Sequence, residues 1–330
     1  MPLLRYAWCH ARRRGGAALI DGGRRVEESG TVPGGQEIPG GHVIPADQLA
    51  REAGLTRVNS RPPFFAYLRS LWQRRAFIRA FAKASVDKQN TKSRLGQFWQ
   101  VMDPVLTMAL YWFLFGFLLG GRGSVENYTG FLAAGVFSFA IIRQSITAGS
   151  RSISGNEGLV RSIHFPRAVL PIAVVMKQLR VFYYAIPIMV VILLITGEPI
   201  TWRWLLAPVG LLLIVMFSLG MALIMSRIIA TLQDVSEILP YLLRIWGYMS
   251  GVMIPIVDRL GRLGLPEWAT FLIGINPGTV YLNVMRDALM ASYFSPGGSL
   301  NWVLAVVWAV VMLPFGLWFF WRAEDRYGRG

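Results

Sequence analysis

The sequence predicts an all-α integral membrane protein with six transmembrane helices, a cytosolic amphipathic interface helix before them, and a re-entrant external helical hairpin between spans five and six. Hydrophobic residues make up 54% of the 330 residues and charged residues only 15%, whereas soluble domains carry roughly 25% charged residues. The apolar residues also gather in runs long enough to cross a bilayer core, which takes about 20 residues of helix. These runs are 104–120, 129–149, 168–196, 204–226, 238–256 and 301–321.

The chain before the first span divides into two segments of different composition. Residues 1–60 are rich in Gly, Arg and Pro with little hydrophobic periodicity, which predicts a disordered cytosolic tail. In the segment 61–103, residues 64–85 place apolar side chains at near-helical spacing opposite Arg and Lys. A basic amphipathic helix with Trp and Phe on its apolar side is typical of the membrane interface. The alternative is a solvated helix packed on a partner.

Lys and Arg residues are concentrated in alternate connections between the spans. They are frequent in 51–103, in the loop after span two and in the last residues, and rare in the loops after spans one and three. Because cytosolic connections carry an excess of Lys and Arg, both termini are expected in the cytosol. The net charge of +15 therefore reflects membrane topology. No nucleic-acid-binding motif accompanies it, so nucleic acid is not an expected partner.

The fifth connection contains two short apolar pieces, EWATFLIGI and TVYLNVMRDALMA, around the sequence Asn276-Pro277-Gly278. Each piece is too short to span, so 264–291 is expected to form a re-entrant hairpin whose backbone is shielded by protein or by a water-filled cavity. We predict that this hairpin closes the external mouth of a channel, with Asn276, Pro277, Gly278 and Arg286 as gate residues. Gly278 would give the backbone room to turn, and Arg286 would line the exit or pair with a dimer mate. The alternative is a static external cap.

Motifs in a fixed order give residues from about 64 to 325 a family resemblance. They are Ser93-x-Leu95-Gly96-x-x-Trp99-x-x-x-x-Pro104 with Tyr111 and Phe115-Gly116, then Asn156-Glu157-Gly158-Leu159-Val160-Arg161 with His164-Phe165-Pro166-Arg167 and Leu170-Pro171, then Asp234, and finally Asn276-Pro277 with Arg286. In these motifs the chain resembles the ABC-2 permeases, the transmembrane subunits of bacterial exporters for O-antigen, capsule, teichoic acid or cell-wall galactan. One departure is Asn90, where many members have an aromatic residue, so no role of that aromatic carries over.

The resemblance implies a multi-pass protein of the bacterial plasma (inner) membrane whose ABC-2 transmembrane domain covers 104–325. It implies a homodimer with two separate ABC ATP-binding subunits, which would hold the ATP and Mg, so that this chain binds no cofactor and is not an enzyme. The cargo would be a lipid-linked polysaccharide. The residues agree with this division of labour, because the chain contains no Gly-Lys dipeptide and therefore no phosphate-binding loop of the Walker type.

Residues 150–167 are the predicted coupling loop to the ATP-binding subunits. Asn156 would cap a short helix that begins at Glu157, and Pro166 would end it. A short helix on a cytosolic loop is a suitable peg for a cleft in an ATPase, and the alternative is an ordinary connector. The predicted coupling residues are Asn156, Glu157, Gly158, Arg161, His164, Phe165, Pro166 and Asp234.

Basic residues near the cytosolic ends of the spans predict a binding site for a lipid headgroup. Arg pairs bidentately with phosphate, and cations at one depth suit a pyrophosphate that enters from the inner leaflet. The alternative for each residue is snorkelling towards the headgroups. The predicted headgroup-binding residues are Lys92, Arg94, Arg143, Lys177, Arg180 and Arg244.

Aromatic residues around the first span predict a surface for sugar rings. Pro104 is tolerated at a helix start, so the interfacial segment is expected to end there and span one to begin. The predicted glycan-channel residues are Trp99, Tyr111, Trp112, Phe113 and Phe115, with packing or lipid-facing roles as the alternative.

Composition indicates which polymer is exported, and the absence of certain motifs argues against other functions. The Arg-rich composition and the run Asn90-Thr91-Lys92-Ser93 favour cell-wall galactan as the polymer. With the lipid link that the resemblance implies, the expected cargo is a polyprenyl-pyrophosphate-linked galactan. The alternatives are a permease for a smaller lipid or drug and a membrane-bound glycosyltransferase. The second lacks an Asp-x-Asp pair for a metal–nucleotide, and one Cys with three His predicts no metal site.

Overall fold

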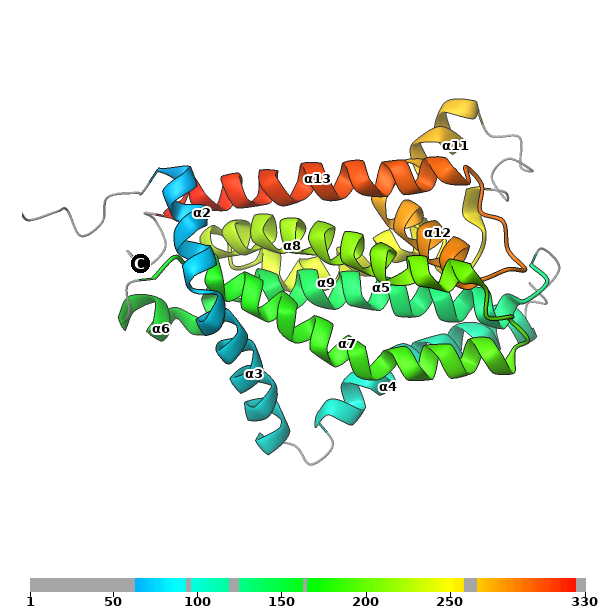
Figure 1. Cartoon of the computed structure of the whole chain (residues 1–330), viewed down its shortest axis with the longest axis horizontal. Coiled ribbons are helices and arrows are strands. Elements are labelled where there is room, and N and C mark those ends of the chain that lie inside the picture. Colours follow the sequence, from blue (N-terminus) through cyan, green and yellow to red (C-terminus); the bar gives the residue numbers. More distant parts are fainter. Residues whose placement is uncertain (1–62, 93–95, 119–124, 163–164, 258–265, 325–330) are drawn as a thin grey trace, which may run out of the picture. The chain divides into compact units, whose positions relative to one another are not determined.

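The computed structural model describes residues 63–92, 96–118, 125–162, 165–257 and 266–324, and the predicted disordered tail 1–60 lies outside them. The described chain is helical (Figure 1). Its elements are α2 (Phe64–Gln73), α3 (Arg75–Lys92), α4 (Gly96–Tyr111), the π-helix η1 (Trp112–Leu118), α5 (Tyr128–Ser150), the short 3₁₀ helix η3 (Ser154–Asn156), α6 (Glu157–Ser162), α7 (Val169–Ile195), the 3₁₀ helix η4 (Trp202–Leu206), α8 (Ala207–Thr231), α9 (Val235–Met249), α11 (Glu267–Gly274), α12 (Pro277–Leu289) and α13 (Ser299–Trp321).

Five helical segments in the described part of the chain are long and apolar enough to cross a membrane. They are Val101–Leu118, Tyr128–Ser150, Val169–Ile195, Trp202–Thr231 and Ser299–Trp321. These segments confirm five of the six predicted runs. The remaining run, 238–256, contains α9, which has only 15 residues and is about 22 Å long, short of the roughly 30 Å hydrocarbon core. A sixth span therefore stays a prediction.

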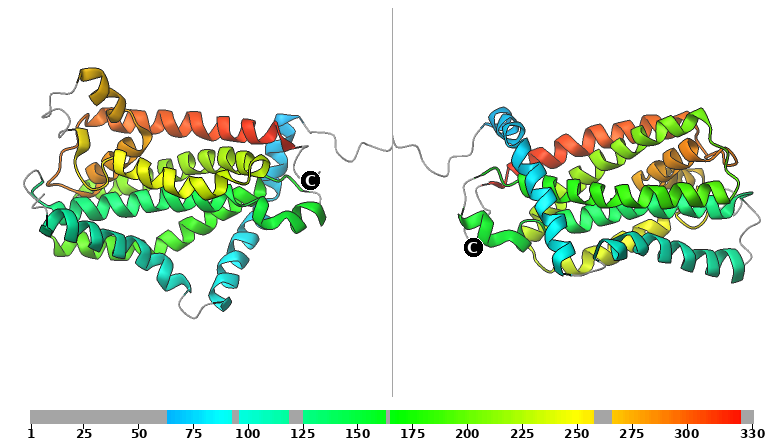
Figure 2. Two further views of the ribbon diagram at one scale, coloured as in Figure 1. Left: turned by 180° about the vertical axis from the view of Figure 1, so that it is seen from behind. Right: turned by 60° about the horizontal axis from the view of Figure 1, so that its bottom comes forward.

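Helix α5 occupies the centre of the bundle. Most of its residues from Tyr128 to Ile142 are buried on every side, because α7, α8, α9 and α12 pack around it (Figures 1 and 2). A second close contact joins α8 to α13. A Cβ atom at Gly220 would overlap the carbonyl of Met312, and one at Gly316 would overlap the carbonyl of Gly220, so the two backbones touch directly.

The amphipathic segment forms two helices, where the sequence predicts one. The N–H of Arg74 is shared between the carbonyls of Ser70 and Leu71, which ends α2 before α3 begins. No Gly or Pro marks this break, so periodicity could not reveal it. Tyr67 and Leu71 of α2 and Ile78 of α3 are nevertheless buried in one small core, shared with the loop around α6 and with the first turns of α7.

A hydrogen-bond network fastens α2 to two other segments of this small core. The Tyr67 hydroxyl donates to the Glu324 carboxylate at 2.8 Å and accepts from the Ala168 N–H at 3.2 Å. The other Glu324 carboxylate oxygen accepts from the Arg167 N–H at 2.8 Å. The N-terminal amphipathic segment, the start of α7 and the residues after α13 therefore meet at one end of the bundle, which we call the α6 end.

The expected helix start at Pro104 is wrong. Helix α4 begins at Gly96 and runs through Pro104, which lies buried inside it. A proline removes one backbone hydrogen bond and clashes with the preceding turn, and here the burial of Val101, Pro104 and Met108 on one face holds the helix together. The segment before Pro104 and span one are consequently one continuous element.

Candidate functional site

Two adjoining cavities lie between α4, α5 and α9. They have volumes of about 300 Å³ and about 520 Å³, and both are lined by Asp103, Arg143 and Arg244. The smaller cavity continues past Tyr111 and Tyr248, and the larger one towards Trp99 and Gln178. We call the two together the basic groove. The three charged residues that line both cavities come from three different helices, and Arg151, just after α5, lines the larger cavity as well.

Arg143 is held in the groove by a carboxylate. Its Nη2 lies 2.6 Å from Oδ2 of Asp103, and the side chains are 30% and 48% exposed. The Gln144 amide donates to the same oxygen at 3.4 Å. Arg143 lies about 10 Å before the end of α5 at Ser150, by the helical rise of 1.5 Å per residue. The pair therefore lies below the surface of the bundle's end, and yet it is open to the groove.

Arg244 faces the same space from α9. It is exposed and lines both cavities. No described side chain forms an ion pair with it. Of the cations predicted to bind a headgroup, the structure thus brings Arg143 and Arg244 together.

The remaining predicted headgroup residues do not line the groove. Gln178 is the α7 residue that borders it. Lys177 and Arg180 on the same helix are rotated away from Gln178 by about 100° and 200°, because successive helical residues turn by that step. Lys92 and Arg94 lie outside the residues whose side chains the structure describes.

The predicted glycan-channel residues fall into two groups. Trp99 is 58% exposed beside the larger cavity, and Tyr111 lines the smaller one with its ring 6.4 Å from that of Tyr248. Trp112 donates from Nε1 to the Thr129 hydroxyl at 3.0 Å, and Phe115 packs against the main core. The last member, Phe113, stacks on exposed Phe117.

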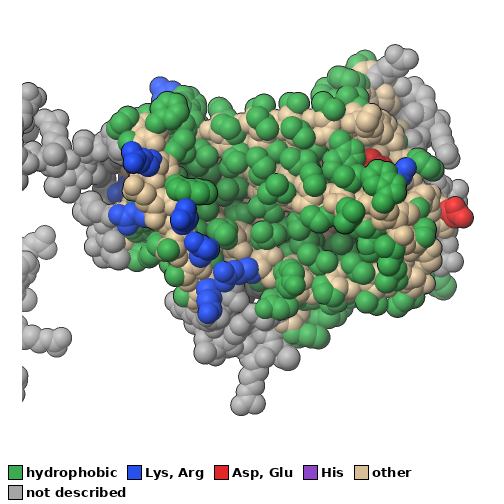
Figure 3. Space-filling view, viewed as in Figure 1, with side chains coloured by type: hydrophobic (Ala, Val, Ile, Leu, Met, Phe, Trp, Pro, Cys, Tyr) green, Lys and Arg blue, Asp and Glu red, His purple; other side chains and the backbone are tan. Residues whose placement is uncertain are grey.

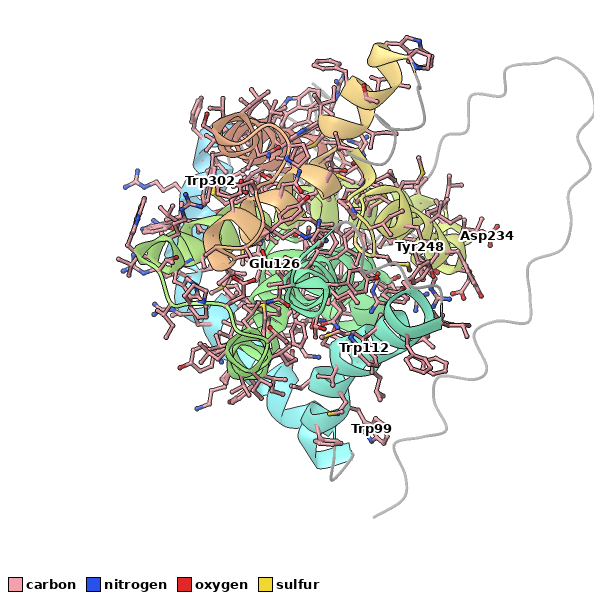
Figure 4. The ribbon with its side chains drawn as sticks, turned by 90° about the vertical axis from the view of Figure 1, so that its right-hand side faces the viewer. Trp99, Trp112, Glu126, Asp234, Tyr248 and Trp302 are labelled. Atoms are coloured by element: carbon pink, nitrogen blue, oxygen red, sulfur yellow. The ribbon has the colours of Figure 1, made fainter. Side chains whose placement is uncertain are left out.

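The end-on view in Figure 4 shows two of these residues, Trp99 and Trp112. Trp99 lies at the periphery of the chain, whereas Trp112 lies nearer to its middle. The structure thus places Trp99 and Tyr111 in the groove, and it does not place Trp112, Phe113 or Phe115 there. For Trp112 and Phe115 it supports the packing alternative.

The predicted short helix of the coupling loop is present as α6, and it begins at Glu157 as expected. Asn156 donates from its amide to the Ser152 carbonyl at 2.8 Å. Val160 and Phe165 are buried against the small core, and the Phe165 ring lies 6.0 Å from that of Phe77 on α3. Gly158 faces open space. Pro166 is half-buried after the helix, and the side chains of Arg161 and His164 lie outside the described ones.

The turn between α8 and α9 adjoins the start of this loop. Arg151 donates to the Ser236 carbonyl at 2.7 Å and pairs with Glu237 at 3.3 Å. Asp234 is exposed in that turn, at the periphery in Figure 4. Asp234 and α6 are therefore both displayed at the α6 end. Figure 3 shows Lys and Arg side chains gathered over α2 and α3 at the same end.

The predicted break at Asn276-Pro277 is present between α11 and α12. The Asn276 side chain accepts from the Gly278 N–H at 3.2 Å and from Nε1 of Trp246 at 2.8 Å, and Pro277 takes the first helical position. Gly278 has an ordinary helical φ, so its expected role in turning the chain is wrong. A Cβ atom there would overlap Ser250, so glycine is needed for the close approach of α12 to the end of α9.

Arg286 lies inside the protomer. It is 2% exposed, its guanidinium is 3.5 Å from the centre of the Phe131 ring, and its Nη2 donates to the carbonyls of Gly251 and Val252 at 3.0 and 3.1 Å. The expectation that Arg286 lines an exit or reaches a dimer mate is therefore wrong for this conformation. Helix α12 is buried among α5, α8 and α13, and its part in a gate stays a prediction.

Sequence reasoning missed Asp103, Gln178 and Tyr248. Asp103 precedes Pro104 within the first motif, and its partner Arg143 lies 40 residues away. The available signal was a single carboxylate at the edge of an apolar run, where a charge needs a partner. The pairing itself depends on how α4 packs against α5.

Comparison with known proteins yields a family and several relatives. A family model described as ABC-2 type transporter matches residues 78–290. The chain is 27% identical over 261 residues to a Myxococcus xanthus O-antigen export system permease protein, RfbA, covering 78% of this chain and 96% of the relative. A Klebsiella pneumoniae protein with the same name is 27% identical over 244 residues, covering 71% and 87%. The Escherichia coli polysialic acid transport protein KpsM is 25% identical over 240 residues, covering 71% and 88%.

Proposed function

This chain belongs to the ABC-2 type transporter family, and from that premise we propose that it is the permease subunit of an ATP-driven exporter for a lipid-linked polysaccharide. The basic groove carries the proposal. It combines Arg143 and Arg244, which suit a phosphate, with Trp99, Tyr111 and Tyr248, whose ring faces suit sugars. The relatives are named for export of O-antigen and transport of polysialic acid, both polysaccharides.

The α6 end is the cytosolic side in this proposal. The described residues there include Arg69, Arg74, Arg75, Arg79 and Lys83 on α2 and α3, and an excess of Lys and Arg is typical of cytosolic segments. Exposed Phe65 and Trp72 on α2 would lie in the headgroup region of the inner leaflet. Both termini would then be cytosolic, and the groove would receive the cargo from the inner leaflet.

The working unit would be a homodimer of this chain with two ATP-binding subunits. Helix α6 and the turn at Asp234 would dock the ATPases, because they are displayed together at the α6 end. ATP and Mg would be bound by those subunits. The finer features of the proposal are a polyprenyl-pyrophosphate carrier, a cell-wall galactan as polymer, six spans, and an external gate formed by α11 and α12.

Co-purification and ATP hydrolysis test this function. The full-length chain is expressed with a candidate ABC ATP-binding subunit from the same genome, purified in nanodiscs, and assayed for ATP hydrolysis with and without lipid-linked galactan. We expect the lipid-linked glycan to stimulate hydrolysis several-fold. A hydrolysis-deficient variant of the ATP-binding subunit serves as the control for contaminating ATPases.

The other outcomes separate the alternatives. Stimulation by a short lipid or a drug, and none by any lipid-linked glycan, would replace the cargo with a small molecule. Transfer of sugar from a nucleotide sugar by the purified chain would support the glycosyltransferase. Purification without any ATP-binding subunit would overturn the proposed assembly.

A further inference from the structure

We propose that Asp103 competes with the cargo for Arg143, and that this competition makes the groove select a lipid with two phosphates over a lipid with one. The proposal rests on the proposed function, because it concerns the headgroup that the groove would receive. Asp103 would be a specificity-determining residue for that headgroup. The sequence motifs gave Asp103 no role.

The geometry shows Asp103 where an anionic ligand of Arg143 would lie. Its Oδ2 accepts from Nη2 of Arg143 at 2.6 Å and from the Gln144 amide at 3.4 Å. These are the kinds of donors that bind a phosphate oxygen. Asp103 and Arg143 both line the two cavities, so the pair forms within the groove itself.

The charge balance then depends on the ligand. Asp103 neutralises Arg143. Arg151 lines the larger cavity only, and it pairs with Glu237 at 3.3 Å. Among the described lining residues, this leaves Arg244 as the cation without an ion-pair partner. A phosphate with a single negative charge finds one available cation and is repelled by the carboxylate. A diphosphate carries more charge, so it can contact Arg244 and also replace Asp103 on Arg143.

The ion pair between Asp103 and Arg143 is weak enough for a ligand to displace Asp103. Its side chains are 30% and 48% exposed, and ion pairs with such exposure contribute little to stability because solvent screens them. A bidentate phosphate with a higher charge binds arginine more strongly than such a carboxylate does. A lipid with one phosphate charge does not bind Arg143 more strongly than the Asp103 carboxylate does.

Selectivity for two phosphates would keep ordinary membrane phospholipids out of a groove that opens to a leaflet. Anionic phospholipids with one phosphate charge surround every basic site at the inner surface of a membrane. A groove with two free arginines would be filled by them. Asp103 lowers their affinity and leaves the diphosphate carrier able to enter.

The competing explanation is that Asp103 only compensates the charge of Arg143 inside the membrane. In that case its removal would change stability, and it would affect all anionic ligands alike. The ratio of affinities for two lipids that differ by one phosphate separates the two explanations.

The test uses the full-length chain with its ATP-binding subunits in nanodiscs made of an uncharged lipid. Binding of geranylgeranyl monophosphate and geranylgeranyl diphosphate is measured at about pH 5, where a phosphate monoester carries about one negative charge. The wild type is compared with Asp103→Asn, which keeps the size of the side chain. Glu126→Gln is the matched control, because it removes one exposed carboxylate at the other end of α5 (Figure 4). Inorganic diphosphate is the third probe.

We expect the wild type to prefer geranylgeranyl diphosphate, and Asp103→Asn to bind the monophosphate about tenfold more tightly with a change below about threefold for the diphosphate. Glu126→Gln should leave both affinities unchanged. Inorganic diphosphate should bind far more weakly than the lipid.

Each other result overturns the proposal. Equal shifts for the two lipids in Asp103→Asn, or the same shifts in Glu126→Gln, would show a general charge effect. Weaker binding of both lipids would show a structural role. Equally tight binding of inorganic diphosphate would show a free anion as ligand. A wild type that binds neither lipid overturns the headgroup site of the proposed function as well, whereas diphosphate binding with an unchanged ratio overturns the role of Asp103 alone.

Discussion

Arg143 belongs to the last third of α5, whereas Arg286 of α12 packs over Phe131 near the start of α5, and the surroundings of the two arginines differ. Arg143 is partly exposed in a groove and bonds to a carboxylate. Arg286 is 2% exposed and bonds to two backbone carbonyls while its guanidinium lies over Phe131. A charge that a ligand can reach is suited to binding, and a charge sealed by carbonyls and an aromatic ring is suited to holding segments together. Both were predicted as functional residues, Arg143 from its place inside a span and Arg286 from its place in the hairpin after Asn276-Pro277.

Substitution of each arginine by methionine tests the difference between Arg286 and Arg143 most directly. Arg286→Met removes the donors to Gly251 and Val252 and should lower the free energy of unfolding by about 3–5 kcal/mol. Arg143→Met should lower it by about 0–1 kcal/mol, because its ion pair is exposed. Thermal unfolding of the purified variants in detergent measures both. Equal melting temperatures for the two variants would contradict the distinction between a sealed and an accessible arginine.

Tyr67 sharpens the comparison, because it is buried like Arg286 and uncharged. Tyr67→Phe removes the hydrogen bonds to Glu324 and to the Ala168 N–H and should cost about 1 kcal/mol. The loss should be local, so amide hydrogen exchange should accelerate in α2 and α3. Leu212→Ala, at an exposed position on α8, is the control. Unchanged exchange in α2 would show that the apolar contacts of Leu71 and Ile78 are sufficient.

Arg143 and Arg244 should matter for transport at little cost in stability. Arg143→Ala and Arg244→Ala should each reduce export of the lipid-linked glycan more than tenfold, with unfolding free energies within about 1 kcal/mol of the wild type. Export is measured as glycan that appears at the cell surface, normalised to the amount of permease in the membrane. Arg203→Ala, at the opposite end of the bundle, should export normally. Normal crosslinking of the glycan to both groove variants would support snorkelling.

The smallest effect on the fold is expected in the coupling loop. Glu157→Ala combined with Arg161→Ala should leave the melting temperature unchanged, because Glu157 is exposed on α6. ATP hydrolysis should continue while export fails. Full export by the double variant at a normal protein level would exclude α6 as the docking element.

The spans were predictable because length and hydropathy alone determine them. Five of the predicted runs agree with observed segments, and Gly and Pro residues correctly marked the break between α11 and α12. The course of the chain at Arg74 and Pro104 was not predictable. A helix ended at the first without a breaker and continued through the second, because packing against neighbouring segments decided both cases.

The site was predictable only where one residue could be judged by itself. An arginine inside an apolar run is recognisable, and Arg143 and Arg244 were found in this way. The rotational orientation of α7 places Gln178 in the groove and turns Lys177 and Arg180 away from it. That orientation depends on how α7 packs against its neighbours. Asp103 was missed and Arg286 was assigned to a surface, because pairing and burial depend on residues far away in sequence.

The contact between Gly220 of α8 and Gly316 of α13 can form only after both helices have been synthesised. Helix α8 leaves the ribosome well before α13, and a chain grows by roughly 5–20 residues per second, so α8 waits about 5–20 s for its partner. During that interval the face around Gly220 has no backbone to pack against, and lipid or an insertion factor must cover it. The face of α8 around Gly220 is therefore uncovered in an incomplete chain and covered by α13 in a complete one. That surface is where a membrane protease or chaperone would recognise an unfinished copy.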